Sequence, residues 1–232
     1  EGVMSWTLGL AGQATPAEAI IVARDILMAE FLDLPIYLQH ISSEQSVALI
    51  REAKARGVKV YAETCPHYFS LTEDACAGYN TAAKVNPPLK REEDRLAICE
   101  ALKDGTLDVI STDHAPHEDD AKDVPFAQAA NGLIGLETSL ALGYTNLVKK
   151  GYLTLFELVE KMSTIPAEIL RLPHGRLDPG MPADFCLFDP DEKWAWKAEN
   201  RASKSRNTPF EGMTLQGHVK ATWVAGKKVY TC

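Results

Sequence analysis

The chain has 232 residues, a length that suits one large domain or a domain with a smaller addition. Apolar residues make up 46% of it, enough to bury a sizeable core and to argue against wholesale disorder. The net charge of −8 disfavours a surface that binds nucleic-acid phosphates or anionic lipid. No apolar run approaches the roughly 20 residues of a membrane span, and no charged-then-apolar leader is visible. We therefore expect a cytoplasmic protein that acts on small molecules, with no nucleic-acid or membrane partner.

The five cysteines are an odd number, and they are scattered without a Cys-x-x-Cys spacing. This pattern disfavours both a disulfide framework and a zinc site made of thiolates. We expect reduced cysteines that are mostly buried.

The first predicted element is a helix that opens at Thr15, Pro16 and Glu18. Thr15 suits the N-cap, Pro16 suits the first helical position, and Glu18 suits a capping box. Apolar residues then recur at helical spacing. A short apolar strand over residues 35–38 follows and ends at His40.

Two further helix–strand pairs are predicted along the chain. Ser42 or Ser43 is expected to cap a helix that leads to a strand over residues 58–63. A helix over residues 91–102 leads to a third strand over residues 107–111. Short strands that alternate with helices of ten or more residues are typical of βαβ units and a parallel sheet.

Each predicted strand ends in polar residues, namely His40, then Glu63 and Thr64, then Thr112 and Asp113. In a β/α barrel the chemistry lies at the carboxyl ends of the strands, where the βα loops converge. The pattern therefore favours a barrel over a doubly wound sheet.

The character of the sequence changes near residue 175. Residues 132–172 have a helical, apolar pattern, whereas residues 175–232 are rich in turn residues and aromatics. Short β runs and a tight hairpin turn are predicted there, at residues 183–189, 219–224 and 225–228. We expect a partial β/α barrel with the catalytic face over residues 1–174 and a small β domain over residues 175–232.

Asp113 follows an apolar strand, with His114 and His117 close by. Carboxylate and imidazole groups suit zinc or a similar divalent ion. Such an ion lowers the pKa of its water toward about 7, and a neighbouring carboxylate can carry the proton to a leaving nitrogen. Taken alone, the pattern also fits a polar loop with hydrogen-bonded side chains.

Two more residues are candidates for the same site. His40 ends a strand on the same face, although an isolated histidine of this kind also fits a core residue bonded to a backbone carbonyl. Asn86 precedes two prolines, which restrict the residues before them to extended conformations. A rigid loop of this kind can hold an amide over a pocket, and the alternative is an ordinary loop asparagine.

Six motifs run along the whole chain in a familiar order. They are Glu63-Thr64-Cys65-Pro66-His67-Tyr68, Lys84-Val85-Asn86-Pro87-Pro88-Leu89, Thr112-Asp113-His114-Ala115-Pro116-His117, Gly132-Leu133-Ile134-Gly135-Leu136-Glu137-Thr138, residues 175–184 and Asn207-Thr208-Pro209-Phe210. Together they resemble dihydroorotase of the bacterial type I class, within the amidohydrolase superfamily.

The resemblance implies the C-terminal part of a TIM-type (β/α)8 barrel with a small β-sandwich, and one or two Zn²⁺ ions at the barrel mouth. It implies reversible cyclisation of N-carbamoyl-L-aspartate to dihydroorotate, in pyrimidine biosynthesis. By the same resemblance, His40 and Asp113 would bind zinc, and Asp113 would be the catalytic acid and base. The substrate would contact Asn86, His117 and the backbone of Asn131 and Gly132.

The sequence departs from the family pattern in two ways. Family members often carry an aromatic residue where this chain has Asn131. The family's paired His-x-His, its bridging ligand and its other metal histidine lie upstream of Glu1. We therefore expect a fragment of a longer enzyme that is inactive alone and forms a homodimer at full length.

Two other functions stay open. A hydantoinase or dihydropyrimidinase shares the barrel and metal chemistry, but these enzymes usually lack counterparts of Asn86 and His117. A non-catalytic dihydroorotase-like subunit tends to lose its metal ligands, whereas this chain keeps His40 and Asp113.

Overall fold

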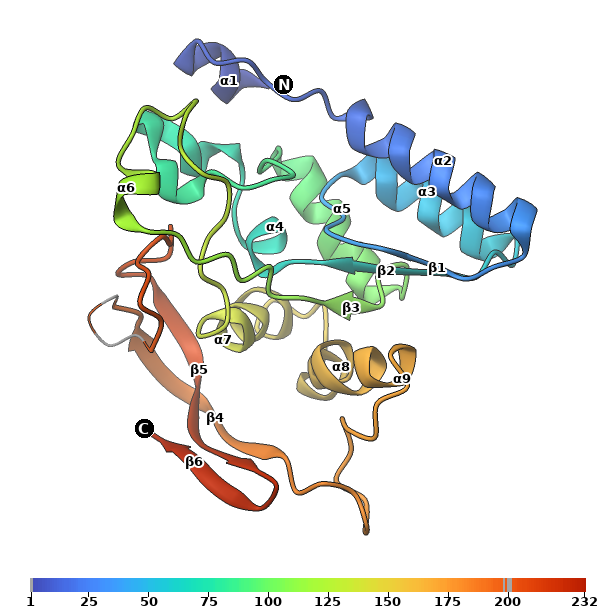
Figure 1. Ribbon diagram of the computed structural model, residues 1–232, viewed down its shortest axis with the longest axis vertical. Helices are drawn as coiled ribbons and strands as arrows, with labels where there is room; N and C mark the ends of the chain where they lie inside the picture. The colour runs from blue at the N-terminus through green and yellow to red at the C-terminus, as the bar shows by residue number, and fades with distance from the viewer. Residues whose placement is uncertain (1, 198, 200–201) are drawn as a thin grey trace. The chain divides into compact units, whose positions relative to one another are not determined.

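The computed structural model describes residues 2–197, 199 and 202–232 (Figure 1). Contacts divide the chain into two compact units. The first runs to Glu137 and includes the segment that ends at Phe210, and the second comprises Thr138–Lys197 and Glu211–Cys232. The units group residues by contact within this chain, so the domain boundary at residue 175 stays a prediction. The family's further metal ligands are expected upstream of Glu1, and Glu1 itself lies outside the described residues.

The first unit is built on a parallel sheet with the order β1-β2-β3. Its strands are β1 (Ile36–Leu38), β2 (Val60–Thr64) and β3 (Val109–Ile110). The β1–β2 pairing aligns Ile36 with Val60, and the β2–β3 pairing aligns Glu63 with Val109. Because all three strands are parallel, their carboxyl ends lie at one edge of the sheet. The predicted parallel βαβ arrangement is confirmed, and with it the α/β class of this part.

The main helices of this unit alternate with the strands, as Figure 1 shows for α2, α3 and α5. The helices of the unit are α1 (Val3–Leu8), α2 (Pro16–Leu32), α3 (Glu44–Ala55), α4 (Pro66–Ser70), η1 (Glu73–Tyr79), η2 (Thr81–Ala83), α5 (Glu92–Lys103) and α6 (Asp119–Lys122). Helices α3 and α5 bury apolar side chains such as Ile50 and Ile98 completely. This packing fixes the loops that follow the strands.

The start of α2 differs from the prediction. Thr15 has helical backbone angles and makes no side-chain cap. Glu18 instead accepts hydrogen bonds from the backbone N–H and the hydroxyl groups of both Ser42 and Ser43. The carboxylate is satisfied by a distant loop rather than by its own helix, which a local capping rule cannot anticipate. Ser43 caps α3 as expected, since its hydroxyl accepts from Ser46 N–H at 3.3 Å.

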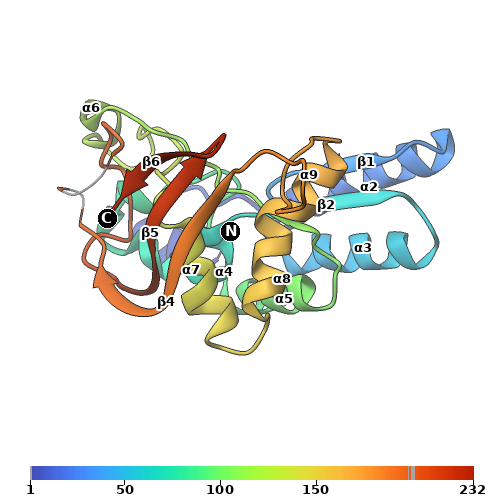
Figure 2. The ribbon, with the colours of Figure 1, turned by 90° about the horizontal axis from the view of Figure 1, so that it is seen from below.

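The second unit combines helices with an antiparallel sheet of order β4-β5-β6, in which β5 is the middle strand (Figure 2). Its elements are α7 (Ser139–Gly143), η3 (Tyr144–Val148), α8 (Leu155–Val159), η4 (Glu160–Thr164), α9 (Ile165–Ile169), β4 (Phe185–Ala195), β5 (Thr214–Val224) and β6 (Lys227–Thr231). The predicted hairpin turn is confirmed, because Val224 pairs with Lys227 across Ala225 and Gly226. Both turn residues have positive φ, as a two-residue hairpin turn requires.

Two expectations from the sequence are corrected by the structure. All five cysteines are free, but only Cys65 and Cys99 are buried, so the expectation of mostly buried cysteines is wrong. The helical pattern expected from residue 132 begins only at Ser139, because the preceding segment forms loops around the candidate site. Among the described residues, no helix has both the length and the apolar character needed to cross a membrane.

Candidate active site

The candidate site lies at the carboxyl edge of the parallel sheet. His40 comes two residues after β1, Cys65 directly follows β2, and Asp113 comes three residues after β3. Glu63 lies within β2 itself, next to its end. Three strands therefore deliver imidazole, thiol and carboxylate groups to one place, as the strand-end pattern predicts.

His40 and Asp113 face each other across this edge. His40 Nε2 lies 3.9 Å from Asp113 Oδ1, and both side chains are partly accessible, at 31% and 22%. Both residues have left-handed backbone angles, with φ of +58° and +46°. Such a conformation costs a non-glycine residue on the order of 1–3 kcal/mol, and residues of this kind cluster at functional sites.

Glu63 orients the His40 ring from the buried side. Its Oε1 lies 3.2 Å from His40 Nδ1, and its Oε2 accepts a hydrogen bond of 2.6 Å from the Tyr37 hydroxyl. Burial and the bond to Glu63 raise the pKa of Tyr37, so the phenol stays protonated and keeps donating. The Glu63 carboxylate beside the ring raises the pKa of His40, although burial opposes this effect. The Cys65 Sγ also lies 3.4 Å from His40 Nδ1. The arrangement leaves His40 Nε2 directed at Asp113.

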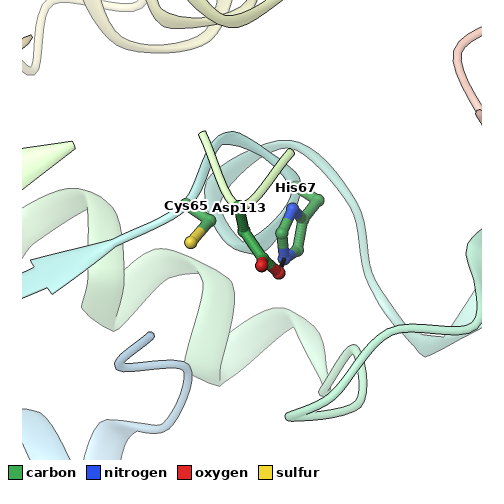
Figure 3. Close-up of side chains that lie close together, drawn as sticks. All are labelled: Cys65, His67 and Asp113. Carbon is green, nitrogen blue, oxygen red and sulfur yellow. Dashed lines mark ion pairs between the residues drawn. The ribbon is translucent and has the colours of Figure 1, made fainter. Parts of the chain in front are cut away.

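Asp113 also has His67 and Cys65 beside it (Figure 3). One ligand atom from each of the three residues lies within 4.8 Å of the others. Burial raises the pKa of Asp113 and, more strongly, that of the Cys65 thiol, which therefore carries its proton. Burial and the nearby His40 lower the pKa of His67 to about 3, so this ring is neutral.

His67 is 1% exposed, and neither of its ring nitrogens has a hydrogen-bond partner in the described part of the chain. Its Nε2 lies 3.9 Å from Asp113 Oδ2. A buried polar group normally has a partner, so this ring is one that a bound ion or water would satisfy. The resemblance leaves His67 out of the ligand set, whereas the geometry brings it within reach.

The predicted substrate-binding residues gather in a neighbouring loop region of the same unit. His117 Nε2 lies 2.8 Å from the carbonyl oxygen of Asn131. A Cβ on Gly132 would lie 2.5 Å from the Ala115 Cβ and 3.2 Å from His117 Nε2. Gly132 also has a φ of +127°, so both its backbone angle and its surroundings require glycine.

Asn86 lines two cavities, of about 240 and 350 Å³. Asn131 also lines the first cavity, and His40 also lines the second. Asn86 therefore adjoins both the residues expected to bind substrate and the residues expected to bind metal.

His114 has a different position from its neighbours in the motif. Its Nδ1 accepts a hydrogen bond from the backbone N–H of Gly135 at 3.1 Å. The ring braces the 132–138 loop, and this nitrogen is not available to a metal. His114 therefore has a structural role in this loop.

Asn207 belongs to the last sequence motif but is not among the predicted site residues. It is buried, and its Nδ2 donates to the carbonyl oxygens of Ala115 and Gly132 at 2.8 and 3.1 Å. Its Oδ1 accepts from the backbone N–H of His117 at 3.2 Å. One amide side chain therefore ties together the two loops that carry His117 and Gly132. The signal available in the sequence is an asparagine two residues before a proline within a motif.

We expect Asn207→Ala to destabilise these loops, because it removes the side-chain donor to the buried carbonyl of Gly132 and to the partly buried carbonyl of Ala115. Each buried polar group left unsatisfied costs about 1–3 kcal/mol. Asn207→Asp should be no less harmful, since a carboxylate would face the same two carbonyl oxygens. Thermal unfolding of both variants measures the effect. An unchanged Tm in Asn207→Asp would contradict the role of the Nδ2 donor.

The chain belongs to the amidohydrolase family, whose model matches residues 27–229. Members of this family are generally metal-dependent hydrolases, which agrees with the imidazole and carboxylate groups at the strand ends.

Curated relatives give a more particular likeness. The chain is 51% identical over 229 residues to a dihydroorotase of Ruminiclostridium cellulolyticum, and 53% identical over 230 residues to a dihydroorotase of Pelobacter propionicus. Each match covers 99% of this chain and 54% of the relative. The chain thus spans about half the length of the curated relatives it matches.

Solved structures support the fold assignment. The dihydropyrimidinase of Brevibacillus agri matches with a TM-score of 0.90 and 28% identity. The L-hydantoinase of Arthrobacter aurescens matches with a TM-score of 0.89 and 31% identity. Both matches cover 94% of this chain and 50% of the solved chain. The predicted class, part of a β/α barrel with a small β domain, is confirmed.

Proposed function

We propose that the protein containing this chain is a dihydroorotase, which cyclises N-carbamoyl-L-aspartate to dihydroorotate reversibly in pyrimidine biosynthesis. The observation that carries this proposal is the meeting of His40 Nε2 and Asp113 Oδ1, 3.9 Å apart at the carboxyl edge of a parallel sheet. The likeness to curated dihydroorotases at about half identity supports the choice of reaction.

The residues present fit a divalent metal ion. Imidazole and carboxylate groups are the ligands that zinc prefers, and the ring of His67 has unpartnered nitrogens beside them. We propose His40 and Asp113 as ligands of one or two zinc ions, with further ligands from the rest of the enzyme. A divalent ion held there supplies a Lewis acid and activates a water molecule. Glu63 supports this role, because a ligating histidine usually donates its other N–H to a carboxylate.

Asp113 is the proposed acid and base. In the hydrolytic direction its carboxylate accepts the proton of the attacking water and delivers that proton to the departing ring nitrogen. Burial raises the pKa of this carboxyl group, which favours its holding the proton between the two transfers. In the biosynthetic direction the same group removes the proton from the attacking nitrogen.

The substrate is proposed to bind Asn86 and His117 through their side chains, and Asn131 and Gly132 through their backbone. His117 and Gly132 meet in one loop region, which Asn207 holds together. Asn86 borders cavities that Asn131 and His40 also line. The enzyme is proposed to act as a cytoplasmic homodimer.

Replacing Glu63 by Gln tests how the His40 ring is held. The variant keeps the size of the side chain but presents a weaker acceptor to His40 Nδ1, so the metal affinity should fall about 10- to 100-fold. Competition with a chelator, followed by metal analysis, measures the affinity in the full-length protein. Tyr61→Phe, at a half-exposed site in the same strand, serves as a control. Equal affinities in wild type and Glu63→Gln would contradict the role.

Metal removal tests the proposed reaction as a whole. The full-length enzyme should lose turnover of dihydroorotate after dialysis against a chelator and regain it when zinc is added back. Retention of full turnover by metal-free protein would overturn the proposal. Absence of bound metal and of turnover in freshly purified protein would instead favour a non-catalytic subunit.

The second candidate is a hydantoinase or dihydropyrimidinase, because two solved enzymes with these names match the fold closely. Their identity to this chain, 28% and 31%, is lower than that of the curated dihydroorotases. Asn86 and His117 also favour dihydroorotase, since the rival enzymes usually lack both.

A further inference from the structure

Two lysine side chains join the chain segments that carry the proposed substrate-binding residues. Lys122 ends α6 and is 8% exposed. Its Nζ donates to the carbonyl oxygens of Thr81, Lys84 and Ala130, at 3.0, 3.3 and 2.7 Å. Three acceptors match the three N–H groups of an ammonium ion. The side chain therefore binds the backbone of two segments, one at residues 81–84 and one at Ala130.

Lys84 makes the reciprocal connection. Its Nζ donates to the carbonyl oxygens of Ala127 and Ala129 at 3.0 and 2.7 Å. Its own carbonyl oxygen accepts from Gly132 N–H at 2.9 Å as well as from Lys122. Lys84 thus binds the backbone of residues 127–129, and Lys122 binds the backbone of residues 81–84.

This pair of lysines lies next to the residues that matter for binding. Asn86 is two residues after Lys84, and Asn131 and Gly132 directly follow Ala130. The lysine contacts therefore set the separation between the Asn86 loop and the backbone of Asn131 and Gly132. The metal-binding candidates His40 and Asp113 come from other strand ends and receive no contact from either ammonium group among the described residues.

We propose that Lys122, together with Lys84, is a positioning residue that fixes the two substrate-binding segments at their working distance. The inference rests on the proposed function, which identifies these segments as substrate-binding. The lysine clamp, defined by the five hydrogen bonds of Lys84 Nζ and Lys122 Nζ, is a separate claim about how the backbone is held. Burial and the charge of Lys84 lower the pKa of Lys122 to about 8, so the group remains mostly protonated at neutral pH. An ammonium ion, unlike a neutral amine, supplies all three donors.

The test compares Lys122→Met with Lys103→Met in the full-length enzyme. Methionine keeps the length and apolar character of the stem but has no donor, and Lys103 is an exposed lysine at the end of α5. In Lys122→Met we expect KM for dihydroorotate to rise about 10-fold, which corresponds to a loss of about 1.4 kcal/mol of binding free energy. We expect kcat to change less than KM and the zinc content to stay unchanged. Lys103→Met should resemble the wild type.

Hydrogen exchange supplies a readout that does not need activity. The amide of Gly132, which donates to the Lys84 carbonyl, should exchange faster in Lys122→Met while amides in β2 stay protected. Lys122→Arg, which keeps a cation and several donors, should recover part of the KM and exchange effects. If Lys122→Met does not fold, Lys122→Gln, with two remaining donors, is judged by the same measurements.

Unchanged KM together with unchanged Gly132 exchange would overturn the clamp. A uniform increase of exchange across the chain, with kcat lowered by the same factor by which KM is raised, would also overturn it, because that result indicates general destabilisation. If the wild-type protein does not turn over dihydroorotate, the proposed function fails, and Gly132 exchange still decides whether the clamp exists.

Discussion

Asp113→Asn in the full-length enzyme is expected to lower kcat for dihydroorotate by about 100- to 10,000-fold, the usual contribution of a general acid or base. The amide is nearly the same size as the carboxylate, but it cannot accept and return a proton. Burial raises the pKa of Asp113, so the wild-type group is suited to hold a proton for part of the cycle. Steady-state kinetics in both directions measure the effect, which should appear in hydrolysis and in cyclisation alike.

The fold should survive this change, because Asp113 contacts neighbouring side chains at 3.9 Å rather than through short hydrogen bonds. Thermal unfolding and circular dichroism check this point. Asp191→Asn, at an exposed position in β4, serves as a control for the loss of one negative charge. Near-normal kcat in Asp113→Asn would contradict the assigned role.

Gly132→Ala is expected to have the second large effect, on substrate binding and on stability. A φ of +127° is unfavourable for any residue with a Cβ, and the new atom would lie 2.5 Å from the Ala115 Cβ. The backbone angle alone costs about 1–3 kcal/mol, and overpacking adds a similar amount. We expect a lower Tm and a higher KM, because the loop that carries Asn131 must move away from His117.

Gly57→Ala separates the cost of the backbone angle from the cost of the close contact. Gly57 also has a positive φ, of +87°, but no heavy atom lies within 4 Å of the added Cβ. The loss of Tm should therefore be smaller in Gly57→Ala, and its KM should stay at the wild-type value. Equal effects of the two substitutions on KM would show that the close approach at Gly132 is unimportant for binding.

The parallel sheet and its site-bearing edge were predictable because short-range patterns specify them. Alternating helices and strands, with a polar residue after each strand, predict that His40 and Asp113 lie at one edge, where the structure has them. The roles of these residues still came from resemblance to a family, since a polar loop explains the same pattern.

The supporting contacts could not be predicted from local rules. Glu18 was assigned to its own helix but bonds Ser42 and Ser43, over twenty residues away. Asn207 reaches Ala115 across more than ninety residues of sequence. The sequence around Lys122 does not predict its burial, because a lysine in a polar stretch usually faces solvent. Interactions of this kind depend on which loops the fold brings together.

The choice of substrate is the most direct test of the central claim. Dihydroorotate differs from dihydrouracil by a ring carboxylate, and polar groups that bind such a carboxylate discriminate strongly against a substrate without it. The measurement is kcat/KM of the zinc-loaded full-length enzyme for dihydroorotate, dihydrouracil and hydantoin under one set of conditions. We expect dihydroorotate to be preferred by at least about 100-fold. Equal or faster turnover of dihydrouracil or hydantoin would contradict the assignment.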